Sequence, residues 1–245
     1  LYEVHRLDLE TGAVINDYYT PEVGLDTWMR GHARGQVMSP DASFLYTLYS
    51  IDPEEERIKD PADPDGFGHF AFVHVISLEE EWSFCIFLPS PFGQRSIDSM
   101  GLAVSPDGST LVAIDSRPGA LVQIDTAELT VTRNSLIGEY DSNGPVPLAI
   151  APDGMIYAAF GSFVQAFEPV GRSYVAGLET AGTVRSMDLS EDGRFLRVAV
   201  PERIHVIDLV SGEEIGQVVL PESAKQVIVG PPTGTRRFEE FTCAC

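Results

Sequence analysis

The sequence has few cations, and only two of them are lysines, Lys59 and Lys225. Sixteen Lys and Arg stand against 37 Asp and Glu, which gives a net charge of −21. A mean field of that sign repels phosphate, so it disfavours nucleic acid and anionic membrane surfaces as broad partners. We interpret the imbalance mainly as a solvated acidic surface. A dedicated cation-binding surface is the alternative.

Cysteine is also scarce, with three in 245 residues. Cys85 lies in the apolar run from Ser83 to Leu88, so we expect it to pack as a small buried hydrophobe. Cys243 and Cys245 would lie one repeat apart on one face of an extended strand, where they pair poorly with each other. A disulfide from Cys85 to either Cys243 or Cys245 is an alternative that the sequence leaves undecided. No second Cys/His pair has zinc-ligand spacing, so no metal site is expected.

Motifs for catalysis and targeting are missing too. There is no Gly-x-Ser-x-Gly, phosphate loop or His-Glu-x-x-His, so no catalytic residue and no cofactor are predicted. Asp115 and Glu202 have the chemistry of general acids or bases, but nothing singles them out. The chain lacks an initiator Met, a signal peptide and a membrane span, and it begins inside a repeat unit. We therefore expect that Leu1 is not the native start, which leaves room for a targeting segment before it.

A repeated strand–turn–strand unit organises what is present. The stretch from Gly101 to Ala113 contains Ser-Pro-Asp-Gly, in which Pro fixes φ, Asp bonds to the backbone and Gly allows positive φ. The turn returns with equivalent aspartates at Asp41, Asp107, Asp153 and Asp192, at separations of 66, 46 and 39 residues. A period near 40 with several strands per unit predicts an all-β fold, a β-propeller of four-stranded antiparallel blades.

About five blade units are expected within one domain, 1–245. Four are whole, at about 33–90, 97–139, 144–178 and 183–221, and two are partial, at about 1–22 and 224–245. The partial ends complement each other, with strands c and d at the start and a and b at the end. Two interpretations stay open: a closed five-bladed ring, and a fragment of a seven-bladed ring.

The loops divide into two faces. The a–b and c–d turns lie on one face of such a disc, and the b–c and d–a loops lie on the other. An acidic, proline-rich insertion at about 51–69 is a b–c loop too charged to build a core. Because loops on a rigid scaffold collect binding residues, we predict that the b–c and d–a face is the working face.

Cations on that face are the candidate site. Arg34, Arg185 and Lys225 occupy equivalent positions at the start of strand a, which lines the central channel of a propeller. Three cations at one channel mouth would focus an anionic ligand. The competing interpretation is that they pair with carboxylates such as Asp98 and Glu179. The full candidate set is Arg34, Arg185, Lys225, Arg30, His32, Arg95 and Arg117.

Two metal-like patterns are interpreted as structural. His5, His74 and His205 are equivalent strand c residues in different blades, too far apart around a ring to share an ion. The acidic stretch Asp60 to Gly66 resembles a calcium loop, but prolines split it and it lacks the late bidentate Glu.

The repeat also carries a family resemblance. Ser-Pro-Asp-Gly after an apolar strand, followed by a segment such as Val206-Ile207-Asp208 to Gly212, resembles the YVTN-type bacterial β-propellers. These belong to the WD40-like, quinoprotein amine dehydrogenase-like group, and the resemblance covers about residues 1–230. It implies a seven-bladed parent that is secreted or anchored outside the cytoplasmic membrane. No catalytic residue of the lactonases or amine-dehydrogenase heavy subunits on this fold maps onto the chain.

Two functional hypotheses follow. The first is a non-enzymatic, extracytoplasmic scaffold that binds a small anionic ligand or a protein. The second is an enzyme on the same fold, either a lactonase-like hydrolase or a quinoprotein-type dehydrogenase subunit. Convergence of titratable groups in one pocket would favour the enzyme, whereas a wide or channel-centred surface would favour the scaffold.

Overall fold

The computed structural model describes residues 6–15, 31–52, 68–95, 98–140, 142, 144–169 and 174–220. These residues form strands β1 to β18 and no helix. Accordingly, none of the described segments is a helix long and apolar enough to cross a membrane.

Four antiparallel sheets of four strands account for most of the described chain, and each follows the order of the sequence. The first sheet contains β3 (His32–Met38), β4 (Phe44–Ser50), β5 (Ala71–Ser77) and β6 (Ser83–Phe87). The second contains β7 (Met100–Val104), β8 (Thr110–Asp115), β9 (Ala120–Asp125) and β10 (Thr130–Leu136). The third contains β11 (Leu148–Ile150), β12 (Ile156–Phe160), β13 (Phe163–Phe167) and β14 (Tyr174–Glu179). The fourth contains β15 (Ser186–Leu189), β16 (Phe195–Val200), β17 (Arg203–Asp208) and β18 (Glu213–Val219). A separate short pair joins β1 (Arg6–Leu7) to β2 (Val14–Ile15).

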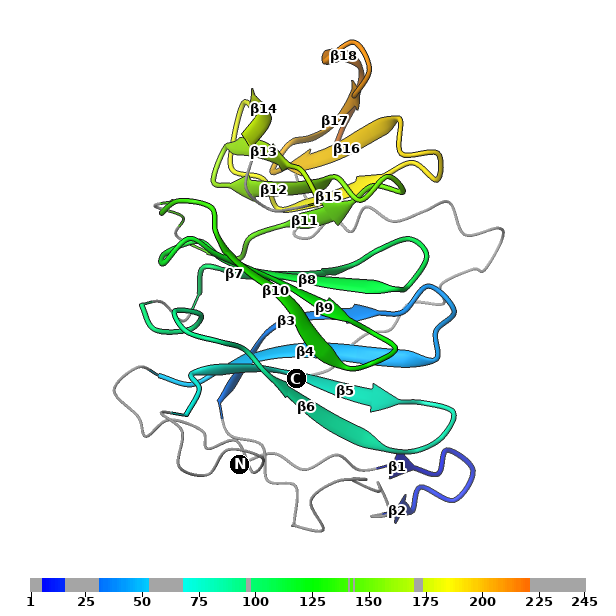
Figure 1. The fold of residues 1–245 in the computed structure, drawn as a ribbon. Coiled ribbons are helices and arrows are strands. Elements are labelled where there is room, and N and C mark those ends of the chain that lie inside the picture. Colours follow the sequence, from blue (N-terminus) through cyan, green and yellow to red (C-terminus); the bar gives the residue numbers. More distant parts are fainter. Residues whose placement is uncertain are drawn as a thin grey trace.

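The four sheets follow one another as blades. Their first strands contact in succession, β3 with β7, β7 with β11 and β11 with β15. A backbone hydrogen bond also crosses between the second and third blades, from the amide of Val146 to the carbonyl of Met100 at 2.9 Å. Figure 1 shows the sheets in sequence order from the blue and cyan β3–β6 to the yellow and orange β15–β18. The predicted fold class, a β-propeller of four-stranded antiparallel blades, is confirmed.

Hydrophobic cores lie between consecutive sheets rather than within them. One core joins the first and second sheets, a second joins the second and third, and a third joins the third and fourth. Strand β5 is buried over its whole length, from Ala71 to Ser77. A strand covered on both faces needs apolar residues at successive positions, which explains why these strands do not alternate.

The Ser-Pro-Asp-Gly turn builds the a–b connections by local chemistry. In the second sheet Asp107 Oδ1 accepts hydrogen bonds from Ser105 Oγ at 2.6 Å and from the Ser109 amide at 3.0 Å. Ser105 Oγ in turn accepts from the Thr110 amide at 2.9 Å, and Gly108 has φ of 76°. Hydrogen bonds from Ser105 and Ser109 lower the pKa of the Asp107 carboxyl, so this carboxylate is charged near neutral pH.

Some predictions about packing are settled by burial. His74 and His205 are both buried, as expected for packing residues, whereas His5 lies outside the described residues. Burial lowers the pKa of His74 to about 4, so it is neutral near pH 7. Cys85 is a free thiol in β6 and is partly exposed, not fully buried as we expected. The reason is its place in an outer strand, whose neighbours cover it incompletely.

Three further predictions involve segments outside the described residues. Most of the insertion, 53–67, is among them. So are both partial units, 1–22 and 224–245, apart from residues 6–15. Blade closure therefore stays a prediction, and Cys243 and Cys245, whose pairing the sequence leaves undetermined, lie outside the described residues.

Candidate functional site

Arg34, the first of the predicted cations, lies in β3 and is held by side chains of β4 and of the connection before β7. Its side chain is 13% exposed, and Nη1 lies 3.0 Å from Asp98 Oδ1. Its Nε donates to Ser50 Oγ at 2.8 Å. The remaining nitrogen, Nη2, is buried and has no hydrogen-bond partner. Arg34 therefore combines an ion pair with one unsatisfied donor.

The other predicted cations are dispersed over the b–c and d–a face. Arg95 forms an exposed ion pair with Glu139, and Arg117 lies in the b–c loop of the second sheet. Arg185 is exposed directly before β15, and His32 is exposed at the first position of β3. Arg34 and Arg185 belong to the first and fourth sheets, with two sheets between them. The last two members of the candidate set, Arg30 and Lys225, lie outside the described residues.

Asp115, the candidate acid or base at the end of β8, has a structural environment. Its side chain is fully buried, and Oδ2 accepts a hydrogen bond from the Gly93 amide at 2.8 Å. Oδ1 accepts from the Arg117 amide at 3.3 Å and from Ser99 Oγ at 3.4 Å. Burial raises the pKa of Asp115 to about 6, against the lowering effect of these hydrogen bonds. The carboxyl thus ties the d–a connection before β7 to the loop after β8, while Glu202 lies in a different sheet.

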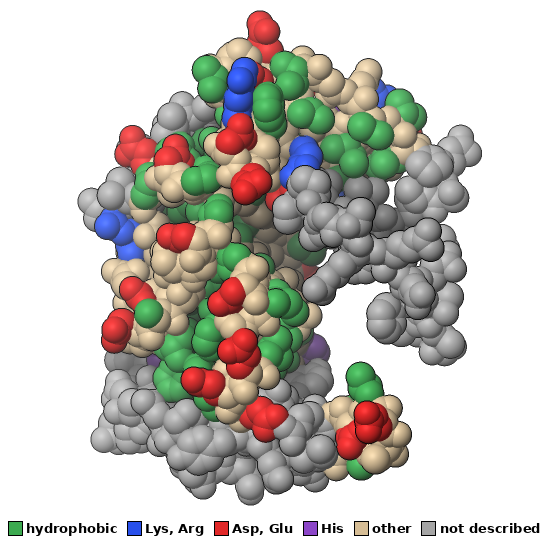
Figure 2. Space-filling view, turned by 90° about the vertical axis from the view of Figure 1, so that its right-hand side faces the viewer, with side chains coloured by type: hydrophobic (Ala, Val, Ile, Leu, Met, Phe, Trp, Pro, Cys, Tyr) green, Lys and Arg blue, Asp and Glu red, His purple; other side chains and the backbone are tan. Residues whose placement is uncertain are grey.

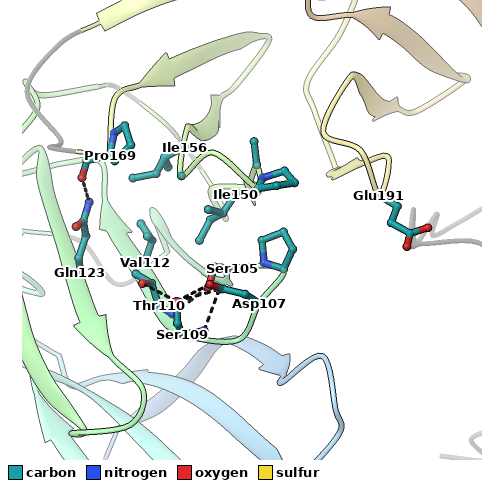
Figure 3. A pocket seen from close by; sticks show the side chains of 14 residues that line it. Ser105, Asp107, Ser109, Thr110, Val112, Gln123, Ile150, Ile156, Pro169 and Glu191 are labelled. Atoms are coloured by element: carbon teal, nitrogen blue, oxygen red, sulfur yellow. Dashed lines mark hydrogen bonds between the residues drawn. The ribbon is translucent and has the colours of Figure 1, made fainter.

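A groove that the sequence did not predict lies on the opposite face, between the second and third sheets. Its volume is about 420 Å³. Figure 3 shows Val112, Ile150 and Ile156 extending into it. The lining residues come from the a–b turns of three sheets, from strands of the second and third sheets and from the c–d loop of the third: Ser105, Pro106, Asp107, Ser109, Thr110, Val112, Gln123, Ile150, Ala151, Pro152, Gly154, Ile156, Pro169 and Glu191.

A one-residue deletion in the third sheet accounts for the opening. In the second sheet residues 105–110 separate the paired residues Val104 and Leu111. In the third sheet only residues 151–155 separate Ile150 from Ile156. The loop closed by the turn hydrogen bond is shorter by one residue: the Ser105 amide donates to the carbonyl of Thr110, five residues on, whereas the Ala151 amide donates to the carbonyl of Met155, four residues on.

The shorter turn removes a contact that closes the other interfaces. A Cβ built on Gly108 would lie 3.3 Å from Cδ of Pro40, the turn proline of the preceding sheet. A Cβ on Gly193 would lie 2.6 Å from Cδ of Pro152 in the same way. The turn glycine of the third sheet, Gly154, instead approaches Pro169 of its own sheet at 3.0 Å. The Pro106 turn therefore has no glycine packed on it, and the space beside it is the groove.

Small side chains widen the same gap. The carbonyl partners that close the long turns are Phe44, Thr110 and Phe195, so these three positions are equivalent. Phe44 packs on the core between the first and second sheets, with Trp82 at a ring-centroid distance of 5.7 Å. The second sheet has Thr110 at this position, so its interface with the third sheet lacks that aromatic volume.

The groove offers binding chemistry rather than reactive groups. Its floor is aliphatic, and its rim has prolines and turn hydroxyls. Asp107 is committed to its own turn, and Gln123 Nε2 donates to the carbonyl of Pro169 (Figure 3). Glu191 stands at the far edge, on the fourth sheet. Within the described ranges no group of three or more His, Cys, Asp or Glu is placed to hold a metal ion.

Negative charge surrounds the groove. Figure 2 looks onto the side where the a–b and c–d turns lie, and its carboxylates are spread over this face with few cations. In the described parts of these turns Arg194 is the single cation, and it pairs with Asp208 at 2.8 Å. The same turns carry the carboxylates of Asp41, Glu79, Glu80, Glu81, Asp107, Glu128, Asp153, Glu168, Glu191 and Asp192. Four of the predicted arginines lie on the other face, where Arg34 and Arg95 pair with Asp98 and Glu139.

Comparison with known proteins identifies the fold and no family. No model of a protein family matches the chain, and no curated protein matches it. Among solved structures it is similar to hydrazine synthase of Kuenenia stuttgartiensis, with TM-score 0.53 and 17% identity over 82% of this chain and 53% of that chain. It is similar to U3-55K, with TM-score 0.53 and 17% identity over 76% of this chain and 52% of that chain. A functionally unknown protein from Desulfotomaculum acetoxidans DSM 771 matches with TM-score 0.54 and 15% identity, over 83% of this chain and 65% of that chain. The chain thus spans between half and two thirds of these structures, and the likenesses support the propeller fold alone.

Proposed function

We propose that the chain is a non-enzymatic binding scaffold, and that the groove between the second and third sheets is its binding site for a ligand or protein partner. The observation that carries the proposal is the lining of the groove. An aliphatic floor with a few fixed polar groups is typical of recognition sites. Of its two carboxylates, Asp107 is held by its own turn, which favours a structural use of that group over proton transfer.

One specific observation favours the enzyme hypothesis, namely the raised pKa of Asp115. Raised carboxyl pKa values occur at catalytic sites and also in buried structural networks. Full burial and hydrogen bonds to two backbone amides support the structural interpretation of Asp115. Hydrolysis of a panel of lactones by the wild-type chain, abolished in Asp115→Asn, would support the enzyme instead.

The channel mouth is a second candidate binding site, with a small anion as its ligand. The buried, unsatisfied Nη2 of Arg34 favours it, because a guanidinium nitrogen without a partner has donors available for an anion. The ion pair with Asp98 weighs against it, since this carboxylate already neutralises the single charge of the guanidinium. A location outside the cytoplasm belongs to the same proposal and is supported by the resemblance to the YVTN-type propellers.

Peptide display tests the scaffold proposal and does not require the natural partner. Random twelve-residue peptides would be selected on the wild-type chain and counter-selected on Thr110→Phe. Phe is the residue at the equivalent positions 44 and 195, so this variant fills the groove with a side chain that the repeat already uses. We expect enriched peptides that bind the wild-type chain and not the variant. Peptides that bind both equally, or no enrichment, would contradict the proposal.

A further inference from the structure

We infer that the groove accepts a lysine or arginine side chain from a basic segment of a partner protein. This inference rests on the proposed binding function of the groove and specifies the chemistry of the partner. The stem of such a side chain matches the floor of the groove. Lys and Arg bury their methylene groups along apolar surface while the charged end stays in water. The exposed prolines Pro106, Pro152 and Pro169 supply such a surface, above the buried side chains of Val112, Ile150 and Ile156 at the bottom of the groove.

The negative charge around the opening of the groove is complementary to the cationic end of a lysine or arginine side chain. Asp107 lies on the near rim and Glu191 on the far edge. Hydrogen bonds lower the pKa of Asp107, so its charge persists at neutral and mildly acid pH. A cationic group above the aliphatic floor would be attracted by both carboxylates, whereas an anionic group would be repelled by both.

The extent of the acidic surface favours a segment of protein as the occupant. The carboxylates of the a–b and c–d turns cover all four sheets, far beyond the groove itself. A small cation would use only the groove, whereas a protein segment with several basic residues would use the whole turn face. Complementary charge on that scale raises association rates and selects partners of opposite sign. We therefore assign a protein segment, not a free amine, as the occupant.

The short turn of the third sheet explains why the groove lies at this interface and not at the neighbouring ones. Full-length turns with a Pro–Gly contact close the interface before it and the interface after it. Among the four described sheets the deletion falls in the third alone, where Ala151 also replaces the turn serine. The repeat thus has one modified interface, between the second and third sheets, flanked by two closed ones.

Methyl NMR with three matched peptides tests the inference. The wild-type chain would carry labelled isoleucine methyls, and the shifts of Ile150 and Ile156 would be followed. The probes are acetyl-Gly-Ser-X-Ala-X-Ser-Gly-amide peptides in which X is Lys, norleucine or Glu. Norleucine keeps the stem of Lys without its charge. We expect the Lys peptide to bind at least about fivefold more tightly than the norleucine peptide at low salt, and the Glu peptide not to bind.

Variants separate charge from shape. Glu191→Gln should weaken binding of the Lys peptide about twofold to threefold, the effect expected when an exposed ion pair is lost. The affinity of the norleucine peptide should not change. Glu202→Gln, on the opposite face of the same sheet, is the matched control and should change neither. Ala151→Ser with a serine inserted after Gly154 restores the long turn and should abolish the methyl shifts. Thr110→Phe tests the same closure from the second sheet, should the insertion fail to fold.

The outcomes distinguish this inference from the proposed function. Equal affinity for the Lys and norleucine peptides would overturn the basic partner and leave the groove as a binding site. Tighter binding of the Glu peptide would overturn it as well. If no peptide moves the two methyls, including peptides selected by display, both the inference and the proposed function fail.

Discussion

Replacement of Gly101 by alanine is predicted to disrupt the contact between the first strands of the second and third sheets. A Cβ built on Gly101 would lie 1.9 Å from the carbonyl oxygen of Val146. Carbon–oxygen contacts are about 3.3 Å or longer, so the strands would have to separate by more than an ångström. The backbone hydrogen bond from Val146 to Met100 lies at the same place and would be strained. We expect Gly101→Ala to lower the free energy of unfolding by about 3 kcal/mol, the upper range for overpacking.

Gly35→Ala is the matched control. Gly35 lies in β3, the equivalent first strand of the neighbouring sheet, and its Cβ would meet Leu102 at 3.5 Å, an ordinary contact. The substitution should change the free energy of unfolding by less than about 1 kcal/mol. Because alanine lowers the conformational entropy of the unfolded chain, a small gain in stability is favoured. Urea unfolding followed by circular dichroism would measure both variants at constant m-value. In thermal unfolding the Gly101 variant should melt about 6 to 12 °C lower. Equal stability of the two variants would refute the radial packing of the first strands.

The remaining predictions concern pH and anions. Asp115 has a folded-state pKa of about 6, above its unfolded value, so its contribution to stability is present at low pH and falls by about 3 kcal/mol as pH rises from 4 to 6. His74 has a folded-state pKa of about 4, below its unfolded value, so its contribution is present above pH 6.5 and falls by about 3 kcal/mol as pH drops from 6.5 to 4. The two slopes oppose each other, so on acidification Asp115→Asn should lose stability more steeply than the wild type, and His74→Gln should lose it less steeply. Parallel urea-unfolding profiles against pH would contradict both assignments. Arg34→Gln with Arg185→Gln should abolish any binding of succinate or phosphate measured by calorimetry, and a wild-type chain that binds neither would dispose of the channel-mouth site.

The sequence predicts the repeat because the chemistry of the repeat is local. Each Ser-Pro-Asp-Gly turn closes on its own side chains, as Ser105 and Asp107 do, so the pattern can be recognised in the turn itself, whatever its neighbours are. Continuous apolar runs predict strands covered on both faces for the same reason. From these two signals the blades and their order follow.

The groove could not be predicted with the same ease, because it results from the absence of a contact between the turn glycine of the third sheet and the turn proline of the second. Ala151-Pro152-Asp153-Gly154 resembles the other turns, and the missing residue after Gly154 is visible only when the repeats are aligned with one another. What the deletion does depends on where Pro106 and Pro169 lie, and this is a matter of packing between sheets. The partial exposure of Cys85 is of the same kind, since it depends on the neighbours of an outer strand.

The central claim is that a partner segment enters the groove between the second and third sheets. A crystal structure of the chain with a peptide selected by display would test that claim most directly. The account predicts a basic side chain of the peptide lying over Val112, Ile150 and Ile156, with its charged end toward Asp107 and Glu191. A peptide bound on the b–c and d–a face, or at the channel mouth beside Arg34, would contradict it.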